Sequence, residues 1–84
     1  MDIEIGTKLK LKTSIGHKEC FIYDKTCDDE FTYLSGYLTK TADFVSIVYD
    51  KERGYRGEIS WSSQTQRRYG LKYTLSFIED IECI

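Results

Sequence analysis

Flat aromatic rings and guanidinium groups concentrate between residues 55 and 73 of the chain. Tyrosine and tryptophan rings can stack on nucleic-acid bases, arginine can clamp phosphate, and both residue types are common anchors of protein–protein interfaces. The sequence therefore predicts a binding surface formed by loops over residues 53–69. The residues predicted to bind are Arg53, Tyr55, Arg56, Gln64, Gln66, Arg67, Arg68 and Tyr69.

Structural roles compete with this interpretation for some of these side chains. Trp61 falls on the apolar face of a predicted strand, where it would belong to the core rather than to a binding surface. Arg56 could pair with Asp50 across two strands, an ion pair that contributes less than about 1 kcal/mol when exposed. The pattern alone leaves both interpretations open.

Few residues could support catalysis or hold a metal ion or a cofactor. His17 is the sole histidine, and no nucleophile, base and oxyanion donors accompany it in a recognisable pattern. The three cysteines and His17 have the atom types of a zinc site, but the spacing H-x2-C-x6-C belongs to no recognised zinc knuckle. Residues 53–57 lack the spacing and the lysine of a phosphate-binding P-loop. We therefore expect no enzymatic activity, no metal and no cofactor.

The sequence contains three cysteines, an odd number: Cys20, Cys27 and Cys83. The chain shows no signal peptide and no apolar run long enough to span a bilayer. These features predict a cytoplasmic protein with free thiols, in which each cysteine is a small core residue. The alternative is a disulfide between Cys20 and Cys27 across a hairpin.

Length and charge restrict the class of protein further. A chain of 84 residues makes a single domain over 1–84, and 40% hydrophobic with 31% charged residues is ordinary for a soluble globular protein. The net charge of −2 argues against a dedicated nucleic-acid binder, which usually carries a basic surface. Residues 51–73 nevertheless hold six cations against two acids, a local charge of +4.

Residues 44–61, FVSIVYDKERGYRGEISW, are expected to form two antiparallel strands joined by a tight turn. Gly54 can adopt the positive φ that such a turn requires, which predicts a three-residue loop ending at this glycine. Counting outward from this loop places Ile47 opposite Ile59. Trp61 then lies on the same apolar face, because side chains alternate along a strand.

Alternating apolar and polar residues predict further strands elsewhere, and no stretch predicts a helix. Gly36 is expected to allow a bend or the close approach of a neighbouring strand. Polar connections separate the strands, among them an acidic loop at 28–30 and a loop at 62–68. The further strands are predicted over residues 3–13, 19–24, 31–40 and 69–77, with a short strand or 3₁₀ turn over 81–84.

Six or seven short strands predict an all-β fold, and closure into a small antiparallel barrel would remove exposed sheet edges. Three stretches resemble Sm-like and SH3-like small β-barrels: Gly6 followed by KLKL and later CFIY, then LSGYL at 34–38, and SFIEDIECI at 76–84. This resemblance implies a barrel of that architecture with little or no helix. The uridine-binding Asp-x-x-Asn pattern and the glycine of the second Sm motif are absent, so the resemblance implies no RNA binding.

We expect a non-enzymatic interaction module that binds a protein partner through the surface at 53–69. The small single-domain format suits a bacterial or phage-encoded inhibitor or adaptor. The alternative is a nucleic-acid- or nucleotide-binding barrel that uses the same arginines and tyrosines. Homo-oligomers formed by pairing of strand edges are a third alternative, and no membrane partner is expected.

Overall fold

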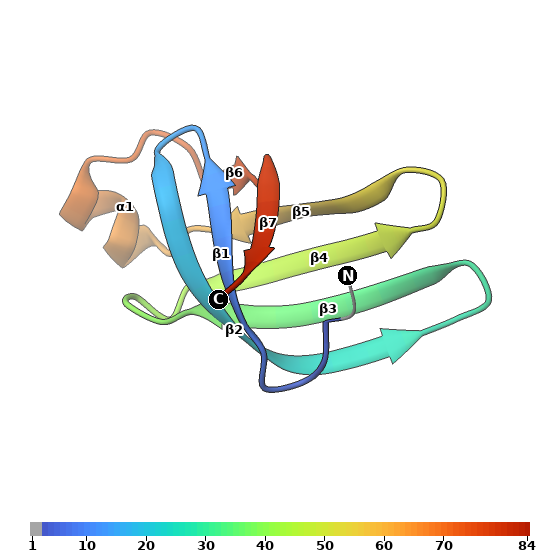
Figure 1. The fold of residues 1–84 in the computed structure, drawn as a ribbon. Helices are drawn as coiled ribbons and strands as arrows, with labels where there is room; N and C mark the ends of the chain where they lie inside the picture. Colours follow the sequence, from blue (N-terminus) through green and yellow to red (C-terminus); the bar gives the residue numbers. More distant parts are fainter. Residues whose placement is uncertain (1–2) are drawn as a thin grey trace.

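One curled antiparallel sheet and one short helix form the fold in the computed structural model, which describes residues 3–84 (Figure 1). The sheet has the strand order β6-β5-β4-β3-β2-β1-β7 and curls into a half-barrel, which confirms the predicted all-β, small-barrel class. Helix α1 lies between β5 and β6 in the sequence. The elements are β1 (Lys8–Thr13), β2 (Gly16–Cys27), β3 (Phe31–Leu38), β4 (Phe44–Asp50), β5 (Gly54–Ser60), α1 (Ser63–Tyr69), β6 (Leu75–Phe77) and β7 (Asp80–Cys83).

The last two strands bridge the two ends of the sheet. β6 pairs with β5 and β7 pairs with β1, although the two strands are consecutive in the chain. Between them, the Ile78 amide donates to the Gly57 carbonyl at 2.9 Å and the Glu79 amide donates to the Lys12 carbonyl at 2.7 Å. The C-terminal segment therefore protects strand edges that would otherwise be open to pairing with another chain.

Aliphatic side chains fill the inner face of the curl. Leu9 and Leu11 are fully buried while the lysines between and around them are exposed, as the predicted alternation of this strand requires. Each fully buried Leu, Ile or Val side chain stabilises the fold by about 1.5–3 kcal/mol through removal from water. The buried hydrophobic residues are Ile3, Leu9, Leu11, Cys20, Ile22, Leu34, Leu38, Val45, Ile47, Ile59, Trp61 and Ile81.

The hairpin of β4 and β5 has the predicted faces but a different register. Ile47 lies opposite Gly57 rather than Ile59, and Val45 takes Ile59 as its partner. A shift of two residues keeps every side chain on its face, so apolar alternation cannot distinguish the two registers. The observed register places Tyr49 opposite Tyr55, with ring centroids 4.6 Å apart, a contact that the predicted register lacks.

The turn of this hairpin also differs from the prediction by one position. Asp50 pairs with Gly54, so the connection consists of residues 51–53 and the glycine, with φ of 75°, follows it. The Asp50 carboxylate accepts a hydrogen bond from the Glu52 amide at 2.8 Å. Asp50 is thereby engaged within the turn. The ion pair between Asp50 and Arg56, the structural alternative for this arginine, is not seen within residues 3–84, where Arg56 lies opposite Val48.

Several predicted strand bounds are wrong. β2 continues to Cys27, beyond the predicted 19–24, because its hairpin with β3 extends past the core, where apolar alternation fades. Only Leu75–Phe77 of the predicted strand 69–77 pairs in the sheet. The predicted polar loop at 62–68 is largely helical, since α1 covers Ser63–Tyr69.

The prediction of three buried, free cysteines holds only in part. No disulfide joins the three cysteines, and Cys20 is fully buried, but Cys27 and Cys83 are exposed. Cys20 and Cys27 belong to the same strand, β2, so a disulfide across a hairpin is not formed. Burial raises the pKa of the Cys20 thiol to about 11.

We expect the thiols to react with Ellman's reagent in two classes. Thiolate is the reactive form, so the buried Cys20 should react at least about 100-fold more slowly than Cys27 and Cys83 at pH 8. Stopped-flow absorbance on wild type and on Cys20→Ser would assign the slow phase. Equal rates for all three thiols in the folded protein would contradict the burial of Cys20.

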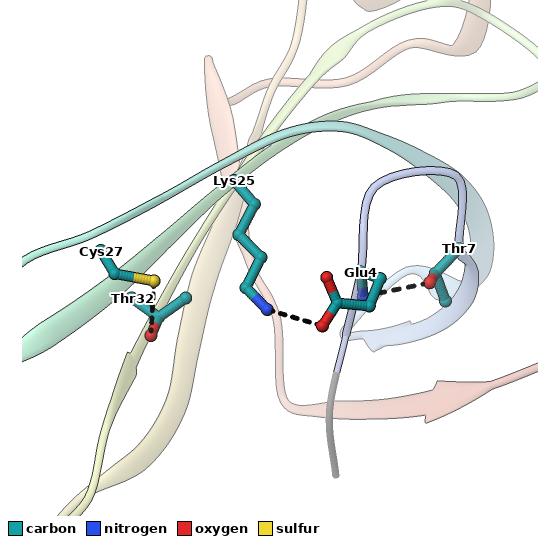
Figure 2. A network of polar contacts seen from close by, with 5 residues as sticks. All are labelled: Glu4, Thr7, Lys25, Cys27 and Thr32. Atoms are coloured by element: carbon teal, nitrogen blue, oxygen red, sulfur yellow. Dashed lines mark hydrogen bonds and ion pairs between the residues drawn. The ribbon is translucent and has the colours of Figure 1, made fainter.

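Polar contacts fasten the N-terminal segment to β2 (Figure 2). Lys25 Nζ forms an ion pair with Glu4 Oε1 at 3.0 Å, and Thr7 Oγ1 accepts from the Glu4 amide at 3.2 Å. The Gly6 amide donates to the Ile22 carbonyl at 2.8 Å. Residues 3–7 thus form a bend against β2 rather than the first half of a straight strand, and they bring Ile3 into the core.

Candidate functional site

The structure divides the predicted binding residues into two groups. Arg53, Tyr55 and Arg56 lie at the turn end of the β4–β5 hairpin, whereas the other predicted residues belong to α1. Figure 1 shows this turn and the helix at opposite ends of the molecule, whose longest dimension is 39 Å. The two groups therefore do not form one continuous surface over residues 53–69.

The hairpin group borders a shallow hollow on the outer side of the sheet. This hollow has a volume of about 480 Å³, and Tyr55, Arg56, Glu58 and Phe77 are among the residues that line it. Tyr55 is half-buried against Tyr49, which gives this ring a structural role. The hollow is open and contains both charge signs, so it defines no particular ligand.

Helix α1 follows directly from local sequence. The Ser62 side chain caps its N-terminus by accepting a hydrogen bond from the Thr65 amide at 3.1 Å. Gly70 ends it in the left-handed region, with φ of 66°. Arg67 and Arg68 stand in the last turn, where positive charge is favourable against the helix dipole. These signals are present in the sequence and could have predicted the helix.

A buried carboxylate holds the start of α1 against the turn between β3 and β4. Asp43 is 4% exposed, and its oxygens accept hydrogen bonds from the Ser62 amide at 2.9 Å and from Thr65 Oγ1 at 2.7 Å. Ala42, the preceding residue, has φ of 63°, a conformation that costs a non-glycine residue roughly 1–2 kcal/mol. The contacts of Asp43 hold the turn in this strained form.

The environment of Asp43 favours its charged form. Desolvation alone would raise the pKa of this carboxyl, but the neighbouring polar groups of Thr41, Ser62 and Thr65 outweigh it and lower the pKa below its ordinary value of 3.8. The Thr41 hydroxyl is buried near this carboxylate, and no hydrogen bond joins the two groups. Asp43 was not among the predicted site residues, because no local pattern distinguishes it from other acidic residues of polar turns.

A cleft of about 660 Å³ opens beside the helix that Asp43 anchors. Three separate segments form it: the β1–β2 turn with the start of β2, the β3–β4 turn, and the chain from Trp61 to Leu71 that includes α1. Its volume lies within the range of pockets that take small ligands or single anchor residues. We call it the α1 cleft; its lining residues are Ile15, His17, Lys18, Glu19, Leu38, Thr39, Lys40, Thr41, Trp61, Thr65, Tyr69 and Leu71.

The α1 cleft has an apolar floor and a polar rim. Trp61 and Leu38 are buried at its base, and the Trp61 indole is fixed by a 2.8 Å hydrogen bond from Nε1 to Ser76 Oγ. Ile15 and Tyr69 are 43% and 58% exposed, so two apolar side chains at the mouth are available to a ligand. Such a cleft can enclose an apolar group and orient it by hydrogen bonds at the rim.

Tyr69 is the one residue of the predicted binding set that lines the α1 cleft. Arg67 and Arg68 are exposed on the adjoining turn of the helix. Glu19 and Lys40 are exposed at the opposite rim of the cleft. Trp61 is buried, as its predicted face requires, yet it contributes to the cleft floor. The prediction that Trp61 is a core residue is therefore confirmed.

Other kinds of site are not seen within residues 3–84. In that range no three His, Cys, Asp or Glu side chains are grouped so that they could hold a metal ion. The acidic residues at 28–30 form a turn instead, in which the Asp28 carboxylate accepts from the amides of Glu30 and Phe31. No helix among the described residues has the length and apolarity needed to cross a membrane.

Comparison with known proteins adds no family assignment. No protein-family model, no curated protein and no solved structure matches this chain. The likeness to Sm-like and SH3-like barrels therefore stays a resemblance of sequence pattern, and the fold and the site rest on the geometry described above.

Proposed function

We propose that the protein is a non-enzymatic interaction module that binds a protein partner in the α1 cleft. The cleft would take one aromatic or aliphatic side chain of the partner on the floor formed by Trp61 and Leu38. Ile15 and Tyr69 would close over this anchor from the rim. Buried apolar anchors surrounded by a polar rim are the usual source of affinity in protein interfaces.

The observation that carries the proposal is the way the cleft is held open. The buried Asp43 carboxylate accepts hydrogen bonds from Ser62 and Thr65, which fixes the start of α1 against the β3–β4 turn on one side of the cleft. A pre-formed cleft loses little conformational entropy on binding, which favours affinity. A cytoplasmic inhibitor or adaptor is the kind of protein that this proposal implies.

Nucleic-acid or nucleotide binding is the second candidate, favoured by the exposed Arg67 and Arg68 beside Tyr69. The two candidates differ in their response to salt. Contacts with phosphate release counterions, so affinity would fall steeply between about 50 and 200 mM salt, whereas an apolar anchor responds weakly. A labelled single-stranded oligonucleotide tested at low salt, with the Arg67→Ala/Arg68→Ala double variant, decides this candidate.

The protein proposal is tested with a random peptide library displayed on phage and selected on the wild-type chain. Trp61 is the sole tryptophan, so binding of a selected peptide in the cleft should change the intrinsic fluorescence. We expect Tyr69→Ala to weaken the selected peptide at least about 10-fold, because it removes an anchor contact at the mouth.

The matched control is Tyr73→Ala, which removes a tyrosine that is 76% exposed, four positions further along the chain and outside the cleft lining. It should change the affinity for the selected peptide by no more than about twofold from the wild-type value. Peptides that bind Tyr69→Ala and wild type equally well, with no change in Trp61 emission, would overturn the proposal.

A further inference from the structure

Lys18, at the start of β2, faces the inner side of the sheet, unlike the exposed lysines of β1. It lies opposite the buried Leu11, and the buried Cys20 follows it two positions later on the same face. Lys18 is half-buried there and lines the α1 cleft. Lysine is uncommon on such a face unless its ammonium can reach water or a partner.

The Lys18 ammonium has no acceptor within residues 3–84. It takes part in no ion pair and no side-chain hydrogen bond there. In the same range the Thr41 hydroxyl is the sole enclosed side-chain polar atom without a partner, so the Lys18 ammonium is not enclosed and can be reached from solvent. A carboxylate that enters the cleft can therefore pair with Lys18 without displacing another group.

The acids beside the cleft do not neutralise this lysine. Glu19 alternates to the outer face of β2, where Lys10 lies opposite it. The Glu19 carboxylate accepts a hydrogen bond from Thr39 Oγ1 at 2.9 Å. The Asp43 carboxylate is directed to the start of α1, where it accepts two hydrogen bonds. Both carboxylates thus have partners of their own.

A second lysine lines the cleft from the turn that follows β3. Lys40 is exposed, and it forms no ion pair with any residue of the described chain. The Thr39 amide donates to the Glu19 carbonyl at 3.0 Å, which holds this turn against the start of β2. Two lysines without acidic partners therefore border one cleft.

The region around the cleft is positive although the chain is not. The segments that form the cleft, residues 13–19, 39–43 and 61–71, hold four cations and two acids, a net charge of +2. Residues 8–12 and 79–83 of the neighbouring strands add three lysines and three acids, which leaves this excess unchanged. Because the whole chain carries −2, the remaining residues together carry −4. This asymmetry directs negative charge of a partner toward the cleft.

We propose that the occupant of the α1 cleft is an acidic segment of a partner protein, in which a carboxylate beside the apolar anchor pairs with Lys18. This inference rests on the proposed function, because it assigns the chemistry of the segment that the cleft binds. The anchor would lie on Trp61 and Leu38, and neighbouring carboxylates would reach Lys18 and Lys40. A basic segment would bring like charges together. A long polyanion such as nucleic acid would extend past the cleft over the negative remainder of the chain.

Three acetylated and amidated pentapeptides test this proposal. Each has a central phenylalanine, and the flanking residues are all glutamate, all glutamine or all lysine. The fluorescence of Trp61 in the full chain reports binding. At low salt the glutamate peptide should bind at least about 10-fold more tightly than the glutamine peptide, and the lysine peptide should bind most weakly.

Lys18→Met keeps the length of the side chain and removes its charge. It should reduce the preference for the glutamate peptide over the glutamine peptide to less than about threefold, and change the affinity for the glutamine peptide by no more than about twofold. Lys18→Arg should restore the preference, because it restores the charge. The matched control Lys51→Met removes the same charge from the β4–β5 turn and should retain the full preference.

Equal binding of the glutamate and glutamine peptides, with Tyr69→Ala weakening both, would overturn this inference and leave the proposed function standing. Failure of all three peptides to change Trp61 emission would contradict both. An oligothymidylate that binds more tightly than the glutamate peptide, and loses this binding in Lys18→Met, would assign Lys18 to phosphate and exclude the acidic segment. Oligomers that Lys18→Met dissociates would assign the cleft to a second copy of the chain.

Discussion

Asp43→Ala is expected to lower the free energy of unfolding by about 2–4 kcal/mol and to detach the start of α1 from the sheet. The variant removes a buried carboxylate and leaves the Ser62 amide and the Thr65 hydroxyl without the acceptor that each has now. Hydrogen bonds to charged groups contribute about 1.5–3 kcal/mol each, and unpaired buried donors add a penalty. Urea unfolding followed by circular dichroism measures the loss.

Two further variants set limits on the expected loss of stability. Asp43→Asn keeps one oxygen as an acceptor and should lose less stability than Asp43→Ala. Ser62→Ala removes the helix cap and should cost about 1 kcal/mol. An Asp43→Ala variant as stable as the wild type would contradict the role given to this carboxylate.

The same residue predicts how stability depends on pH. The pKa of Asp43 is lowered in the folded state, so the folded chain binds fewer protons than the unfolded chain near pH 3.8. The contribution of Asp43 is therefore present above about pH 4 and is lost as the pH falls through the lowered value. Asp28, whose pKa is also lowered, contributes in the same direction. Only the difference between wild type and Asp43→Asn isolates Asp43, and this difference should shrink on acidification.

Gly36→Ala is expected to destabilise the barrel by about 2–3 kcal/mol or to prevent folding. A Cβ atom at this position would lie 2.5 Å from the Phe21 carbonyl oxygen and 3.0 Å from Ile22 Cδ1. The closest of these atoms belongs to the backbone of β2, so the strand itself would have to move. Differential scanning calorimetry of the variant would show the loss.

Gly54→Ala is the matched comparison for Gly36→Ala. At Gly54 nothing lies within 4 Å of an added Cβ, and the only cost is the positive φ of 75°. That cost is roughly 1–2 kcal/mol. If Gly54→Ala proved more damaging than Gly36→Ala, the close approach of β2 and β3 would be contradicted.

Alternation correctly predicted which side chains face the core in β1, β4 and β5, because it is a local property, although it predicted too long a strand over residues 69–77. Leu9 and Leu11 face inward and the lysines beside them face outward, as their spacing requires. Gly36 sits where two strands approach closely, as predicted. The register of β4 with β5 was wrong by two residues because a shift of that size leaves every face unchanged; the Tyr49–Tyr55 contact and the Asp50 turn distinguish the alternatives.

The candidate site was harder to predict from the sequence, because contacts between residues far apart in the chain form it. Helix α1 had local signals, the Ser62 cap and Gly70, that outweigh its polar composition. The Asp43 contacts join residues about 20 positions apart, and the cleft joins three segments of the chain. Residues 53–69 are close together in the sequence, which suggested that they form one surface. β5 is extended, however, so the turn before it and the helix after it lie at opposite ends of the molecule.

Binding of a partner in the α1 cleft is best tested by following the Trp61 indole N–H signal during titration with a phage-selected peptide. This group lies beneath the α1 cleft and is held in place by Ser76. Binding in the cleft should shift this signal together with the amide signals of Thr65 and Leu71, and Tyr69→Ala should suppress the shifts. Shifts confined to Arg53, Tyr55 and Arg56, with the indole signal unmoved, would place binding at the hairpin and contradict binding in the α1 cleft.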